Sequence, residues 1–259
     1  MLLAVDAGNT NVVIGLFPDG DTLDMHAHWR ISTDTSRTAD EYGVIIRSLL
    51  ADVGVCPSDI QGVVVCNVVP PIEPTLRRTA VAISGTHPLV VGPDTNTGVR
   101  VRYDPPEEVG PDRVVNAAAA FHLYGGPAIV VDYGTATTFD AISEQGDYLG
   151  GAIAPGIGIS MEALFARAAR LRRIDLKPPA KAIGASMIDS LRSGILYGFA
   201  GQTDEMVRRF KAELGENATV VATGGLAEIV APETQTVQHV NPLLTLQGLK
   251  IIWDRQNPR

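Results

Sequence analysis

The sequence has little cysteine and no long apolar segment. Its two cysteines, Cys56 and Cys66, show no metal-ligand spacing, so we expect buried thiols and neither a zinc site nor a disulfide framework. No apolar run approaches the roughly 18 residues that a helix needs to cross a bilayer. The sequence therefore predicts no membrane-spanning helix and no membrane partner.

Basic charge is also scarce. The chain has 21 Lys and Arg against 29 Asp and Glu, which gives a formal net charge of −8. A general nucleic-acid surface needs a basic footprint, so we expect no nucleic-acid partner. The first ten residues, MLLAVDAGNT, contain no basic n-region of a signal peptide, and a cytoplasmic location is the expectation.

An acidic turn between two apolar runs opens the chain. Residues 2–17 read LLAVDAGNTNVVIGLF, which predicts a strand, a tight turn and a second strand. Asp6 leaves the first strand, and Gly8 lets a phosphate approach the main chain closely. Such a bend can bind a metal ion and phosphates, but the same residues also suit an ordinary hairpin turn.

A second copy of this turn lies half a chain away. Residues 130–138 read VVDYGTATT, again an aliphatic run, Asp, one residue, Gly and small polar residues. Asp132 follows Asp6 by 126 positions (132 minus 6) in a chain of 259. The repeat predicts two related subdomains, each supplying an acidic loop to one cleft.

The remaining pattern alternates helices and strands. Thr38 and Glu41 have capping-box spacing ahead of an amphipathic helix that ends near Val53. Further strands are expected over 24–31, 62–69, 89–91 and 218–222, and further helices over 70–83, 114–124, 188–209 and 242–253, with one beginning near 161. We expect the helix that begins near residue 161 to carry Arg167, Arg170, Arg172 and Arg173 on a solvated or subunit-contacting face. This order is typical of an α/β fold.

The connection over residues 96–113 is polar, rich in Pro and Gly, and the best candidate for binding a substrate. Asp112 lies at the start of the helix that follows, where a carboxylate can serve simply as a cap. The pair Asp112–Arg113 also suits phosphoryl transfer. The aspartate can accept a hydroxyl proton, and the arginine can neutralise a carboxylate or phosphate.

The repeated order of strand, Asp-x-Gly and strand resembles the superfamily of sugar kinases, actin and heat-shock chaperones. Six motifs in series narrow the resemblance to type III pantothenate kinases over nearly the whole chain. They are Asp6-x-Gly8-Asn9-Thr10, Trp29-Arg30-Ile31-Ser32-Thr33 before Asp40-Glu41-Tyr42, Gly110-x-Asp112-Arg113, Asp132-x-Gly134-Thr135-Ala136-Thr137, Gly150-Gly151 with Pro155-Gly156, and Thr223-Gly224-Gly225.

The resemblance implies two ribonuclease H-like halves, 1–113 and 114–259, with a nucleotide cleft between them. It implies ATP-dependent phosphorylation of the primary hydroxyl of pantothenate, the first step of coenzyme A synthesis. It also implies Mg²⁺ or another divalent cation, K⁺ or NH4⁺, and a homodimer with active sites at the subunit interface.

Roles for individual residues follow from the resemblance alone. Asp112 is the expected general base, Asp132 the ligand of the monovalent cation, and Asp6 the organiser of Mg²⁺ through water. The expected ATP-binding residues are Asp6, Ala7, Gly8, Asn9, Thr10, Asn11, Val12, Val13 and Thr135. The expected pantothenate-binding residues are Tyr103, Gly110, Pro111, Asp112, Arg113 and, from the partner chain, Met187.

Met187 departs from the pattern, because family members usually carry a threonine there that reaches pantothenate. A thioether cannot donate the hydrogen bond of a hydroxyl, and an unpaired buried group costs about 1–3 kcal/mol. Three readings stay open: Ser186 substitutes, pantothenate binds weakly, or the substrate is another small hydroxy acid. A non-catalytic regulatory or transcription-accessory relative is the remaining alternative.

Overall fold

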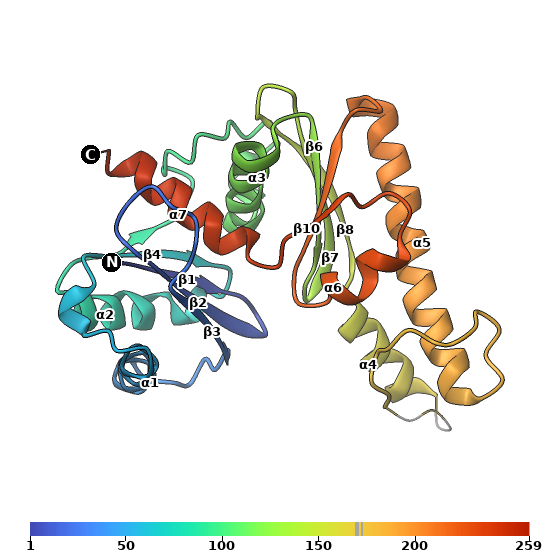
Figure 1. The fold of residues 1–259 in the computed structure, drawn as a ribbon, viewed down its shortest axis with the longest axis horizontal. Helices are drawn as coiled ribbons and strands as arrows, with labels where there is room; N and C mark the ends of the chain where they lie inside the picture. The colour runs from blue at the N-terminus through green and yellow to red at the C-terminus, as the bar shows by residue number, and fades with distance from the viewer. Residues whose placement is uncertain (169–170, 172, 259) are drawn as a thin grey trace. The chain divides into compact units, whose positions relative to one another are not determined.

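The computed structural model describes residues 1–168, 171 and 173–258, and contains two five-stranded sheets flanked by helices (Figure 1). The chain forms two compact units. Unit 1 comprises Met1–Arg100, Asp104–Ala119 and Thr245–Arg259, and unit 2 comprises Val101–Tyr103 and Ala120–Leu244. Each unit therefore contains segments that are distant in the sequence.

The sheet of unit 1 has the strand order β3-β2-β1-β4-β5. Strands β1, β2 and β3 form an antiparallel meander, and β4 and β5 continue the sheet in parallel with β1. The strands are β1 (Leu2–Ala7), β2 (Asn11–Phe17), β3 (Ala27–Ser32), β4 (Gly62–Asn67) and β5 (Leu89–Val90). The predicted meander and the two following strands are confirmed.

Helices cover both faces of this sheet. On one face, Leu3 and Val65 pack with residues of α1 (Ala39–Asp52) and α2 (Glu73–Ser84) in one buried apolar cluster. On the other face, Gly15 and Gly62 leave room for side chains of α7 (Leu244–Gln256). Three short 3-10 helices complete the unit: η1 (Pro57–Asp59), η2 (Pro70–Ile72) and η3 (Pro106–Glu108).

The predicted capping box at the start of α1 is present. The Thr38 hydroxyl accepts a hydrogen bond from the Glu41 N–H, and the Glu41 carboxylate accepts from the Thr38 N–H at 2.7 Å. These bonds satisfy donors that a helix start otherwise leaves unpaired. The sequence pattern therefore located this helix start correctly.

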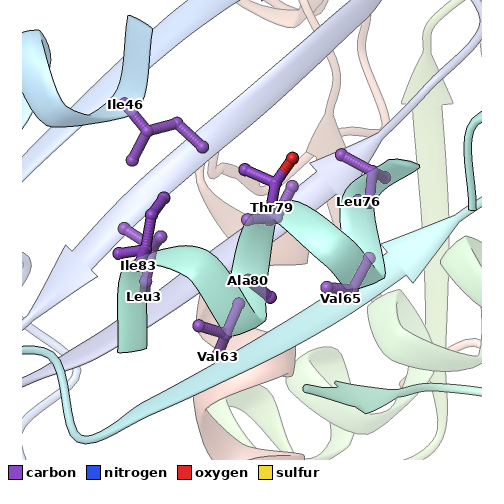
Figure 2. A pocket seen from close by; sticks show the side chains of 9 residues that line it. Leu3, Ile46, Val63, Val65, Leu76, Thr79, Ala80 and Ile83 are labelled. Carbon is purple, nitrogen blue, oxygen red and sulfur yellow. The ribbon is translucent and has the colours of Figure 1, made fainter. Parts of the chain in front are cut away.

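A small cavity of about 10 Å³ lies between α2 and the sheet of unit 1. Figure 2 shows apolar side chains of β1, β4, α1 and α2 converging on it, with the Thr79 hydroxyl as the polar group. That hydroxyl already donates to backbone carbonyls of Thr75 and Ala39. The cavity is thus a packing gap in the core with room for about one water molecule, and it offers no chemistry.

The sheet of unit 2 repeats the plan, with the order β10-β9-β6-β7-β8. Its strands are β6 (Ala128–Tyr133), β7 (Ala136–Ile142), β8 (Tyr148–Pro155), β9 (Thr219–Thr223) and β10 (His239–Val240). Its helices are α4 (Ile157–Arg167), α5 (Met187–Leu214), α6 (Ala227–Val230) and η4 (Ala231–Glu233), whereas α3 (Pro111–Tyr124) has residues in both units. The half-length repeat in the sequence is therefore a repeat of sheet topology.

The two aspartates occupy equivalent positions in the two sheets. Asp6 pairs with Val13 on the antiparallel neighbour and with Cys66 on the parallel neighbour. Asp132 pairs in the same way with Thr138 and Thr223. The predicted α/β fold of two related halves is confirmed. The compact units differ from the expected halves 1–113 and 114–259, since α7 belongs to unit 1, and those boundaries stay a prediction.

One expected helix is shorter than predicted. Helix α4 ends at Arg167, so Arg173 lies beyond it, and Arg170 and Arg172 fall outside the described residues. Arg167 therefore lies on α4 as expected and Arg173 does not, and the expectation for Arg170 and Arg172 is not tested by the described residues. Among the helices of the described residues, none is both long and apolar enough to cross a membrane.

Candidate active site

The first acidic turn, residues 8–10, is held by hydrogen bonds from two sides. The Gly8 N–H donates to the Asn11 carbonyl at 3.0 Å, which closes the turn between β1 and β2. Thr33, just beyond β3, donates its hydroxyl to the Gly8 carbonyl at 2.5 Å and its N–H to the Thr10 carbonyl at 3.0 Å. Asn9 and Thr10 remain exposed. The turn is thus fixed while its polar tip faces solvent.

Asp6 and Asp112 lie near a common neighbour in unit 1, the buried thiol of Cys66. Burial raises the pKa of Cys66 well above its usual range, and the charges of Asp6 and Asp112 raise it further. Because β1 and β4 are parallel, Asp6 and Cys66, each the second-last residue of its strand, lie side by side near the carboxyl ends of these strands. The start of α3 brings Asp112 near the same thiol. Two predicted functional carboxylates therefore lie near the Cys66 thiol.

Asp112 is the second residue of α3, and its position depends on Gly110. One Asp112 carboxylate oxygen, Oδ1, accepts the N–H of Arg113 at 2.9 Å. A Cβ at position 110 would lie only 2.5 Å from the same oxygen, so a side chain there would displace the carboxylate. Burial raises the pKa of Asp112, although the N–H and the charge of Arg113 lower it. A carboxylate with a raised pKa suits a general base.

The second acidic turn, residues 134–135, is closed by a hydrogen bond from the Gly134 N–H to the Ala136 carbonyl at 3.0 Å. Gly134 and Thr135 are exposed. Beside them, the buried Tyr133 hydroxyl lies 2.7 Å from the hydroxyl of Thr203 on α5. Burial raises the pKa of Tyr133 to about 12, so this phenol stays neutral and anchors β6 to α5.

Asp132 lies in a cradle of glycine backbone within unit 2. Gly224 has a φ of +90°, and a Cβ there would lie 2.4 Å from Oδ1 of Asp132. A Cβ at Gly134 would lie 3.3 Å from the same oxygen. The absence of side chains leaves a carboxylate beside main-chain polar groups. This donor set fits a hard, oxygen-seeking cation.

Tyr103 belongs to unit 2 and lies over β8, where a Cβ on Gly150 would meet its ring at 3.6 Å. The preceding residue, Arg102, forms a 2.7 Å ion pair with Asp147 and donates its N–H to the Tyr148 carbonyl. These contacts hold the segment 101–103 on β8. Tyr103 is 37% exposed, so its ring is available to a ligand.

Met187 is the first residue of α5, and its side chain is 50% exposed. Its neighbour Ser186 caps the helix. The Ser186 hydroxyl accepts the Asp189 N–H at 3.1 Å and donates to the Asp189 carboxylate at 2.7 Å. Ser186 already has a structural role, which weakens the reading that it replaces the missing threonine.

The predicted site residues thus fall into two groups. Unit 1 holds the turn from Asp6 to Val13 together with residues 110–113, and unit 2 holds Asp132, Thr135, Tyr103 and Met187. Sequence reasoning gave no role to Thr33 or Cys66. The register of the predicted meander, which pairs the end of β3 with the first turn, is the signal that could have identified Thr33.

The chain matches the family model described as type III pantothenate kinase over residues 2–209. A protein of Moorella thermoacetica named type III pantothenate kinase is 51% identical over 98% of this chain and 99% of its own length. One of Geobacillus kaustophilus with the same name is 49% identical over 100% and 99%.

Solved structures with low sequence identity share the fold. A Baf family transcriptional activator from Campylobacter jejuni has a TM-score of 0.63 at 20% identity, covering 99% of this chain and 98% of its own. The activator of 2-hydroxyisocaproyl-CoA dehydratase from Clostridium difficile, with bound ADPNP, has a TM-score of 0.59 at 14% identity and covers 99% and 96%. The structures support the fold, and the family model and the sequence relatives show that the chain belongs to the type III pantothenate kinase family.

Proposed function

We propose that this chain phosphorylates pantothenate through Asp112 as general base and the turn from Asp6 to Val13 as phosphate-binding loop. The reaction is ATP-dependent transfer of a phosphoryl group to the primary hydroxyl of pantothenate, in coenzyme A biosynthesis. The observation that carries the proposal is the position of Asp112. Its carboxylate lies at the start of α3, has a raised pKa and shares the neighbour Cys66 with Asp6.

Asp112 accepts the proton of the attacking hydroxyl as the oxygen bonds to the γ-phosphorus and the bond to ADP breaks. Phosphoryl transfer has a loose, metaphosphate-like transition state, so positioning and positive charge contribute more than covalent help. Arg113, which is 8% exposed, pairs with the carboxylate of pantothenate and fixes the hydroxyl relative to Asp112. Gly110 leaves space for the Asp112 carboxylate and so keeps it in place. Tyr103 lines the pantothenate site.

The first turn fits a phosphate site, since Gly8 carries no side chain and the tips of Asn9 and Thr10 are exposed. Thr33 ties the carbonyls of Gly8 and Thr10, which keeps the turn in one conformation. Thr135, at the exposed tip of the second turn, contacts ATP. No Lys or Arg occurs within residues 6–13.

Asp6 would hold a divalent cation such as Mg²⁺ through water, and the ion would neutralise phosphate charge. Within the described part of the chain, no group of three or more His, Cys, Asp and Glu side chains is arranged to hold a metal. A single carboxylate plus substrate phosphates and water is the usual way in which proteins bind Mg²⁺ in such sites. Asp6 therefore suits a metal that arrives with ATP.

Asp132 would hold K⁺ or NH4⁺ in the glycine cradle formed with Gly134 and Gly224. The cation would supply positive charge toward the phosphates, since neither acidic turn contains a lysine. The enzyme acts as a cytoplasmic homodimer, and the exposed Met187 faces pantothenate in the partner's active site. The missing hydroxyl at this position lowers the affinity for pantothenate without altering the phosphoryl transfer.

The test is formation of 4'-phosphopantothenate, followed by mass spectrometry, with purified protein, MgATP and pantothenate. The wild type should form product, and Asp112→Asn should lower turnover at least a hundredfold, as expected for loss of a general base. Near-normal turnover by Asp112→Asn would show that another group accepts the proton. Absence of product with the folded wild type would refute the reaction itself.

A further inference from the structure

Arg30 on β3 lies in a row of residues that crosses the sheet of unit 1 to Asp6. Arg30 pairs with Val13 on β2, Val13 pairs with Asp6 on β1, and Asp6 pairs with Cys66 on β4. Directly opposed residues in neighbouring strands project their side chains from the same face. Arg30 therefore shares a face with Asp6 at a separation of two strands, about 10 Å between backbones.

Arg30 is also next to the first acidic turn along its own strand. Three residues later, Thr33 makes the two hydrogen bonds that hold the Gly8 and Thr10 carbonyls. The Arg30 side chain therefore leaves β3 close to the turn, from the sheet face that also carries the Asp6 carboxylate. A long side chain can extend from there toward a phosphate on the turn.

The guanidinium has no partner within the described residues. Arg30 is exposed, and it forms no hydrogen bond or ion pair there. Its neighbour Arg37 is engaged, because it donates to the Ser32 carbonyl at 3.2 Å and its guanidinium lies 5.0 Å from the centre of the Tyr42 ring. Arg30 is thus an uncommitted cation near the turn.

The negative charge at this edge of the sheet favours a nearby cation. Asp6 and Asp112 are both acidic, and residues 6–13 contain no Lys or Arg. ATP would add several further negative charges, of which one divalent ion offsets only two. Arginine suits the remaining task because its planar fork donates two parallel hydrogen bonds to a phosphate.

We propose that Arg30 is a phosphate-binding residue of the nucleotide site and contacts the β- or γ-phosphate of ATP from β3. The inference rests on the proposed function, in which residues 6–13 form the phosphate loop. It adds a residue from the third strand to that loop and supplies the positive charge that the loop itself lacks.

The test compares Arg30→Gln with Arg78→Gln by calorimetric measurement of MgATP binding. Arg78 is an exposed arginine of α2, on the opposite side of the same sheet, so it controls for loss of one positive charge from unit 1. Arg30→Gln should raise the Kd for MgATP about tenfold or more and leave the KM for pantothenate unchanged. Arg30→Lys should lie between the wild type and Arg30→Gln, and Arg78→Gln should match the wild type.

Two outcomes would overturn the proposal, and they have different meanings. If the wild type binds MgATP and Arg30→Gln binds equally well, or no worse than Arg78→Gln, Arg30 does not contact the phosphates and the proposed function stands. If the folded wild type does not bind MgATP, the phosphate loop is wrongly assigned and both proposals fail. Thermal melting of each variant, expected to be unchanged for these exposed positions, confirms that the fold is intact.

Discussion

At the scale of single residues, the surroundings of Asp112 determine both the position and the pKa of its carboxylate. Gly110 leaves space for it, the Arg113 N–H orients it, and burial raises its pKa. The raised pKa means that the native state holds the Asp112 proton to a higher pH than the unfolded chain does. The sequence alone could not reveal this shift, because it depends on what surrounds α3.

This shift predicts how Asp112 affects stability. Its stabilising contribution is fully present below the ordinary value of 3.8 and is lost as the pH rises through the raised pKa. At neutral pH the native state therefore bears the cost of a half-buried charge. Asp112→Asn removes that cost, so its melting temperature at pH 7 should equal or exceed that of the wild type, with a smaller advantage at acidic pH. A clear loss of stability at pH 7 would show that the charge is well compensated.

Met187 provides a second prediction at the residue scale. Its side chain is half exposed at the start of α5, and the neighbouring Ser186 hydroxyl is occupied as a helix cap. Met187→Thr restores a hydroxyl and should lower the KM for pantothenate about tenfold, with little change in kcat. Met187→Val is the control, because valine has nearly the shape of threonine but no hydroxyl. Equal KM values for these two variants would mean that another group already binds that part of pantothenate.

At the scale of elements, the same strand order and aspartate register occur in both sheets. The sequence predicted this repeat because a strand, an Asp-x-Gly turn and a second strand leave a compact pattern. It also predicted the start of α1, since the capping box is a local signal. The assignment of α7 to unit 1 was not predictable, because it depends on contacts between distant segments. The end of α4 at Arg167 also differs from the expectation, because the sequence pattern placed later arginines on the same helix.

The site residues also divide into those that a local motif revealed and those that required the structure. Asp6, Asp112 and Asp132 were recognisable because each stands in a short motif. Arg30 and Thr33 also stand in a motif, residues 29–33, but their positions beside the first turn depend on the register of β3 against β2, which the motif does not give. The glycine cradle of Asp132 joins the turn after β6 to the turn after β9, so it also required the structure.

The cradle gives a prediction at the scale of a turn. Gly224→Ala would place a Cβ 2.4 Å from the Asp132 carboxylate at a φ of +90°, so we expect it to displace that carboxylate. Activity in potassium should fall toward the level measured in sodium. Gly201→Ala is the matched control, because Gly201 lies within α5 with no atom within 4 Å of the added Cβ. Potassium stimulation of Gly224→Ala equal to that of Gly201→Ala would place the cation elsewhere.

At the scale of the whole molecule, two units of similar topology carry different sets of proposed site residues. Unit 1 contains the first acidic turn, Arg30 and the Asp112–Arg113 pair, and unit 2 contains Asp132, Thr135, Tyr103 and Met187. The same sheet topology therefore occurs twice, and the residues around each turn differ. In unit 1, Arg30 of β3 and Thr33 just beyond that strand lie near the first acidic turn. In unit 2, backbone of Gly134 and Gly224 lies beside Asp132.

The most direct test of this account is the rate at which the wild-type protein phosphorylates pantothenate with MgATP in potassium and in sodium buffer of equal ionic strength. We predict turnover that potassium stimulates severalfold, with the stimulation lost in Asp132→Asn. Equal rates in the two buffers would contradict the role of Asp132. No turnover in either buffer, from folded protein, would contradict the central claim that this chain is a pantothenate kinase.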